Sequence, residues 1–207
     1  MFGAKKSISK KAAGWLVEAL DNVYVSEAGV KSALYRVRRE LKDMGLLFAN
    51  SRMSRVEVVY EGLSRAGLVS FVGIMGFYDP QTQSIHIPAT WPAALLPWYK
   101  ERCMVDVLRH EFGHALEGKF PQFFHDERFR RAFGGEYGVI EVAKDGDERN
   151  YVSSYARKYT QEDFAETFML FLKHKGVLPK EFSRRKAIRV KWDTVAAICQ
   201  NIAKKKK

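Results

Sequence analysis

Residues 107–118 have the sequence VLRHEFGHALEG, which contains the motif H-E-x-x-H at His110, Glu111 and His114. On an α-helix, residues four apart lie one turn apart on the same face, so both imidazoles can reach a single Zn²⁺ ion. Glu111 is offset by one residue, where its carboxylate can hydrogen-bond a metal-bound water and act as a general base. The surrounding residues are largely apolar, and polar side chains in apolar surroundings usually have partners. We therefore interpret this stretch as a metal-binding helix rather than a surface helix with two solvated histidines.

The same pattern predicts a helix from about Trp98 or Tyr99 to Glu117, with Gly118 as its terminator. Asp106 precedes His110 by one turn on the same face. Two interpretations of Asp106 stay open. Its carboxylate orients a ligand imidazole from behind, or it is an ordinary solvated helix residue.

A length of 207 residues with 46% hydrophobic content is typical of one well-filled domain, with room for a small appendage. Cys103 and Cys199 are far apart and form no C-x-x-C motif, so neither a disulfide framework nor a cysteine zinc site is indicated. We expect a cytoplasmic protein with no membrane association, because the sequence has neither a signal-peptide pattern nor a membrane span.

The net charge of +11 is concentrated at the two ends of the chain. Residues 1–44 carry +4, residues 45–179 carry −1, and residues 180–207 carry +8, including the tail Lys204–Lys207. A basic end can bind nucleic acid or acidic proteins, and it can equally be a solubilising tail.

Periodicity predicts helices at residues 10–22 and 27–44, the second ending at Gly45. A basic helix pair is also compatible with a DNA-binding helix-turn-helix, although a charged solvent face is the commoner cause. From Val56, β-branched and aromatic residues predict a small sheet that ends in a hairpin. We expect its last strand, residues 84–88, to be an edge strand, which could pair with an extended peptide or be an ordinary sheet edge.

A second helix is predicted after Thr160, which we expect to be its N-cap with Asp163 at the third position. Glu162 and Glu166 share one face of this helix, which is otherwise rich in phenylalanine and leucine. Two carboxylates in apolar surroundings are costly unless they meet a cation, and zinc held by two histidines would be one. Either glutamate can then be the third ligand.

Together these residues resemble the gluzincin metallopeptidases, the group that includes the catalytic domain of anthrax lethal factor and small bacterial and phage relatives. The likeness covers GFYDPQTQSIHIP, HEFGH and the segment from Tyr155 to Glu166. It implies that Glu162 is the third zinc ligand, that Tyr155 stabilises the oxyanion, and that Glu166 orients a histidine. Tyr151 and Tyr159 are lesser rivals of Tyr155. A metzincin is excluded, because Glu117 and Phe120 stand where its glycine and third histidine would be.

The resemblance implies an α+β fold of the zincin type, with an edge strand beside the H-E-x-x-H helix and a glutamate helix following it. We expect an N-terminal helical segment at residues 1–50, a catalytic core at 51–179 and a basic C-terminal helix and tail at 180–207. The expected function is a zinc-dependent endopeptidase acting on a protein or peptide substrate, with an irregular stretch at 119–150 walling its cleft. The alternative is a nucleic-acid or protein-binding module with a latent zincin core.

Overall fold

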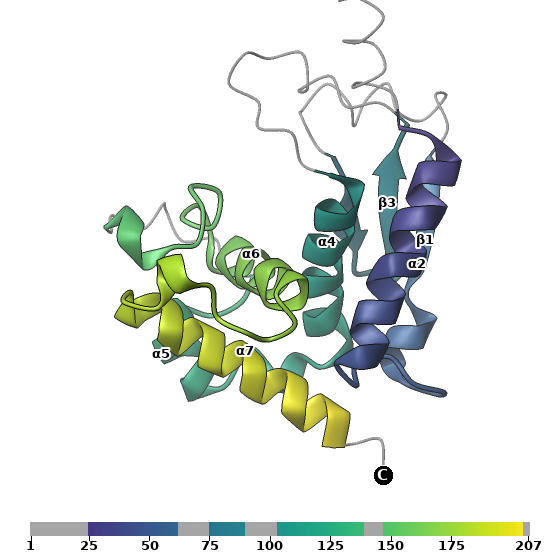
Figure 1. Cartoon of the computed structure of the whole chain (residues 1–207). Helices are drawn as coiled ribbons and strands as arrows, with labels where there is room; N and C mark the ends of the chain where they lie inside the picture. The colour runs from purple at the N-terminus through teal and green to yellow at the C-terminus, as the bar shows by residue number, and fades with distance from the viewer. Residues whose placement is uncertain (1–24, 62–74, 90–102, 139–146, 205–207) are drawn as a thin grey trace, which may run out of the picture.

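A computed structural model describes residues 25–61, 75–89, 103–138 and 147–204, and these form an α+β protein (Figure 1). The described residues contain five α-helices, three strands and several short 3₁₀ helices. The α-helices are α2 (Glu27–Asp43), α4 (Met104–Lys119), α5 (Glu127–Phe133), α6 (Thr160–Lys173) and α7 (Lys186–Lys204). The strands are β1 (Glu57–Glu61), β2 (Phe77–Asp79) and β3 (Ser84–Pro88). The predicted helix at 10–22 lies outside the described residues.

The sheet has the order β1-β3-β2, with β1 parallel and β2 antiparallel to β3. β2 and β3 form the predicted hairpin, whose turn is closed by Asp79 accepting hydrogen bonds from the Gln81 amide and the Thr82 hydroxyl. The prediction that β3 is an edge strand is wrong. It is the central strand of the described sheet, because residues 57–61 pair along its whole length on the side away from β2.

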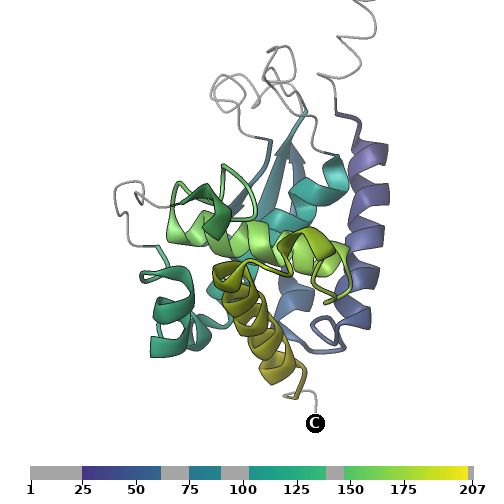
Figure 2. The same cartoon turned by 60° about the vertical axis from the view of Figure 1, so that its left-hand side comes forward.

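The helices cover one face of the sheet and then extend away from it. The side chains of Ile85 and Ile87 on β3 are fully buried and belong to the core that α2 and α4 share. Figure 1 shows α4 between β3 and α6, and both views show α7 running below α6 (Figures 1 and 2). The motif helix is therefore enclosed by its neighbours, which explains why its residues are so apolar.

Gly113, inside the H-E-x-x-H motif, lies where α4 packs closely against α6. A Cβ atom at this position would lie 3.1 Å from the Cα atom of Ala165 on α6, which is tighter than an ordinary contact with backbone. The missing side chain lets the two helices approach, and so brings carboxylates of α6 within reach of the histidines of α4.

Two helix ends follow the predictions and three differ. Ser26 caps α2, and Gly45, with φ of 73°, follows its end. The motif helix begins later than predicted, since Cys103 is extended, and it ends at Lys119 rather than at Glu117, so Gly118 does not terminate it. The N-cap of α6 is the extended Tyr159, not Thr160, which is the first helical residue.

The ends of the described chain belong to one hydrophobic core with the sheet and the motif helix. Val37 and Leu41 of α2 and Val195 and Ile202 of α7 are buried in that core. A cluster of phenylalanine rings is centred on Phe164 of α6. It joins α6 to α5 and to Phe124, which follows the 3₁₀ helix Pro121–Phe123. The helices among the described residues include none with the length and apolar character needed to cross a membrane.

Candidate metal centre

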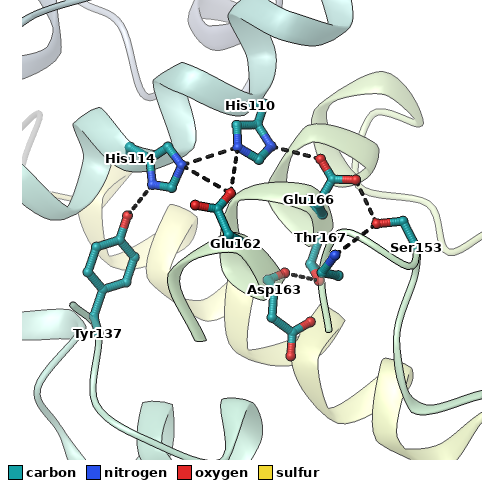
Figure 3. Close-up of polar contacts among 9 residues, drawn as sticks. His110, His114, Tyr137, Ser153, Glu162, Asp163, Glu166 and Thr167 are labelled. Carbon is teal, nitrogen blue, oxygen red and sulfur yellow. Dashed lines mark hydrogen bonds and ion pairs between the residues drawn. The ribbon is translucent and has the colours of Figure 1, made fainter. Parts of the chain in front are cut away.

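One atom from each of His110, His114 and Glu162 points to a common centre between α4 and α6 (Figure 3). The Nε2 atom of His110 lies 3.1 Å from Nε2 of His114 and 3.1 Å from Oε2 of Glu162. The third separation, from Nε2 of His114 to Oε2 of Glu162, is 3.7 Å. Ligand atoms about 2.0–2.1 Å from a tetrahedral zinc ion would be separated by about 3.3 Å. The three donors therefore fit a zinc ion in both atom type and spacing.

The second nitrogen of His110 is held by the glutamate that lies one turn further along α6. Oε1 of Glu166 lies 2.8 Å from Nδ1 of His110, and both side chains are buried. Because a carboxylate accepts hydrogen bonds, Nδ1 carries the proton and Nε2 of the neutral ring has its lone pair available for a metal. The structure thus places Glu162 among the ligand atoms and Glu166 behind the imidazole.

Glu166 is itself oriented by Ser153, a residue that sequence analysis did not identify. The Ser153 hydroxyl donates to Oε2 of Glu166 at 2.7 Å, and the Ala156 amide donates to the Ser153 hydroxyl at 3.1 Å. These bonds attach the segment that carries Tyr155 to the glutamate behind His110 (Figure 3).

His114 has its own partner, Tyr137, which sequence analysis also missed. The Tyr137 hydroxyl lies 2.6 Å from Nδ1 of His114 and gives this ring the same orientation, with Nε2 toward the centre. Burial, with the negative charges of Glu117, Glu162 and Glu111, raises the pKa of Tyr137 well above its usual value. The phenol is therefore neutral at physiological pH, and its oxygen can accept a hydrogen bond from Nδ1–H of His114.

Replacing Tyr137 by Phe should weaken zinc binding about 10- to 100-fold, because His114 loses the partner that fixes its ring. Competition with a chromophoric chelator measures this affinity. Tyr159→Phe is the matched control, since Tyr159 is an exposed tyrosine at the start of α6, and it should bind zinc as the wild type does. Equal affinity in the two variants would show that Tyr137 does not position His114.

The electrostatics of the metal-free centre favour a protonated His110. Burial alone would lower the pKa of His110, but the hydrogen bonds with Glu162 and Glu166 outweigh it and raise this pKa to about 9. Burial would raise the pKa of Glu162, whereas its hydrogen bonds with His110 and His114 hold it well below its ordinary value. At neutral pH, then, a proton on Nε2 of His110 occupies the position that a metal would take.

Zinc must displace this proton, so its apparent affinity should rise with pH. Below a pKa of about 9 the imidazole is mostly protonated, and each pH unit from 7 to 9 should strengthen binding by about tenfold, with a plateau above. The carboxylate of Glu162 adds no dependence in this range, because it is already ionised. Chelator competition between pH 7 and 9 measures the slope, and a flat profile would contradict the protonated state of His110.

The two predicted catalytic residues lie beside this centre. Glu111 is buried on α4, and its carboxylate makes no hydrogen bond to any other residue that the structure describes, although its charge acts on both His110 and Tyr137. The ring of Tyr155 lies 5.8 Å from that of His110, measured between centroids, and its side chain is 37% exposed. Its rival Tyr151 instead packs under the ammonium group of Lys191.

The prediction that Asp106 orients a ligand imidazole is wrong. Its Oδ1 accepts a hydrogen bond from Arg109 at 2.5 Å, and its Oδ2 accepts one from Lys173 at 2.8 Å. Arg109 is buried and also binds Glu40 of α2, so it needs both acids to neutralise and solvate its guanidinium group. Asp106 therefore joins α4 to α6, and Arg109 joins α4 to α2, so neither side chain supports a ligand imidazole.

Asp163, predicted to help cap α6, has a different partner. It is fully buried and pairs with Lys191 of α7 at 2.6 Å, while Lys191 also donates to the carbonyl oxygen of Asn150. This pair attaches the back of α6 to α7, on the side away from the histidines.

The predicted cleft wall at 119–150 is only partly within the described residues, which end at 138 and resume at 147. A surface cavity of about 490 Å³ lies between α5 and α7, and Arg128, Arg131 and Asp193 are among its lining residues. The three metal-site residues do not line it.

The chain was also compared with known proteins. No family model, curated protein or solved structure matched it.

Proposed function

We propose that the chain is a zinc-dependent metallopeptidase of the gluzincin type, with a zincin-like fold, that hydrolyses peptide bonds of a protein substrate. The observation that supports this most strongly is the near-tetrahedral spacing of the donor atoms of His110, His114 and Glu162. The same helix that supplies both histidines also carries Glu111, whose carboxylate has no hydrogen-bond partner among the described residues. Metal-assisted peptide hydrolysis uses this set of groups: two imidazole nitrogens and one carboxylate to bind the metal, and a second carboxylate nearby to act as the base.

Each residue of the proposed site has a defined task in the reaction. His110, His114 and Glu162 would hold a zinc ion, which would supply Lewis acidity and lower the pKa of a bound water toward about 7. Glu111 accepts the proton of the attacking water and returns it to the leaving amine. Tyr155 donates a hydrogen bond to the oxyanion that develops on the scissile carbonyl. Glu166 and Tyr137 hold the two imidazoles in the tautomer that binds a metal.

The test combines metal analysis of freshly purified protein with digestion of a peptide library. We expect stoichiometric zinc, and cleavage that stops when a chelator removes the metal and returns when zinc is restored. Chelator-insensitive cleavage would contradict a zinc mechanism. Zinc without cleavage of any peptide would favour the alternative expected from the sequence, a binding module with a latent core, and would leave the metal site in place.

A further inference from the structure

The outward face of α2 carries four cations around an exposed tyrosine. These residues, here called the α2 stripe, are Lys31, Tyr35, Arg38, Arg39 and Lys42, and all five are exposed. At 3.6 residues per turn they lie within about 60° of Tyr35 around the helix axis. The opposite face of the helix buries Val30, Ala33, Val37 and Leu41. The core therefore fixes the orientation of α2 and turns the stripe toward solvent.

Positive charge exceeds negative charge around the stripe, because Glu27 and Asp43 are the only exposed acids of α2. Glu40, the acid in the middle of α2, is turned toward the core, where Arg109 binds both of its oxygens. Glu27 pairs with Lys31 at 2.7 Å, but both side chains are largely exposed, and such pairs are weak. Arg38 donates to the carbonyl oxygen of Val56, the residue that follows the 3₁₀ helix Arg52–Arg55, so its guanidinium group is held at the edge of the stripe.

Tyr35 makes this surface more than a charged face, because 72% of its side chain is exposed in the middle of the cations. A ring in this position can stack on a base while the neighbouring lysines and arginines neutralise phosphates. The stripe extends for about 16 Å along the helix, enough for several consecutive phosphates. The bases of a duplex are stacked on one another, and an acidic peptide has no base to stack, so an unpaired strand fits the surface best.

We propose that the α2 stripe binds single-stranded nucleic acid, through its cations to the phosphates and through Tyr35 to a base. In both views α2 lies at the outer margin of the fold, with α4 between it and α6 (Figures 1 and 2). A bound strand therefore leaves the metal centre accessible. The proposal does not depend on peptidase activity.

The test measures fluorescence anisotropy of a labelled oligothymidylate of about 16 nucleotides with the full chain at increasing salt. Tyr35→Ala should weaken binding about 5- to 150-fold, whereas Tyr35→Phe keeps the stacking ring and should stay within about threefold. Arg39→Gln should reduce the slope of log affinity against log salt by about 0.7. Arg184→Gln, which removes an exposed arginine outside the stripe, is the matched control and should change neither quantity.

Three results would overturn the proposal. The first is no binding at the lowest salt concentration. The second is equal affinity of wild type and Tyr35→Ala, as expected if the lysines at the chain ends carry all the binding. The third is competition by a duplex of the same length, or by polyglutamate, as effective as that by the single strand. Circular dichroism of each variant checks the fold, and all four substitutions are at exposed positions.

Discussion

Replacing Glu162 by Ala should abolish stoichiometric zinc binding, whereas Glu166→Ala should retain it with an affinity about 10- to 100-fold lower. Glu162 provides one of the three donor atoms that face the common centre, so its loss leaves two imidazoles alone. Of the three proposed ligands, Glu166 contacts only His110, at the nitrogen Nδ1 that faces away from the centre. Its loss frees the ring to turn but removes no donor atom.

Metal content after dialysis, followed by zinc titration of the same samples, separates the two effects. Glu181→Gln is the control, because Glu181 is an exposed carboxylate in a short helix before α7. Each sample is compared by circular dichroism, since both glutamates are buried and their loss changes stability as well. If Glu166→Ala loses the metal and Glu162→Ala keeps it, the alternative ligand assignment is the correct one.

Replacing Glu111 by Gln should leave zinc bound and reduce peptide cleavage by about 10²- to 10⁴-fold, the usual contribution of a general base. The amide has nearly the shape of the carboxylate but cannot take a proton from water. Because Glu111 is not among the three donors at the common centre, the metal should stay at wild-type occupancy.

Turnover is measured on the best peptide from the library, with zinc content determined on the same preparation. The Glu181→Gln control should cleave at the wild-type rate. An unchanged rate in Glu111→Gln would exclude Glu111 as the base, and loss of zinc would show that this side chain supports the metal site instead.

The local part of the site could be predicted because it depends on helical period. His110 and His114, and likewise Glu162 and Glu166, are four residues apart, and any α-helix places such pairs on one face. The hairpin between β2 and β3 could be predicted for a similar reason, since its turn residues and both strands are adjacent in the chain.

Contacts between distant segments could not be predicted in the same way. Asp106 does share a face with His110, but Arg109 and Lys173 take its oxygens, and the choice depends on how α2 and α6 dock. Tyr137 lies in an irregular segment with no spacing that relates it to His114. The central position of β3 depends on pairing with β1, which precedes it by 27 residues in the register Glu57 to Ser84.

The two contacts of α6 with a single imidazole also fix the register of that helix against α4. Glu162 and Glu166 meet the two nitrogens of His110, so sliding α6 by one turn would bring Glu166 to Nε2 and Leu170 to Nδ1. Leucine accepts no hydrogen bond, and the buried N–H would lose about 1–3 kcal/mol. Rotation by one residue would present Asp163 and Thr167 instead and leave Lys191 buried without its acid. Both of these misalignments are thus penalised, whether or not a metal is bound.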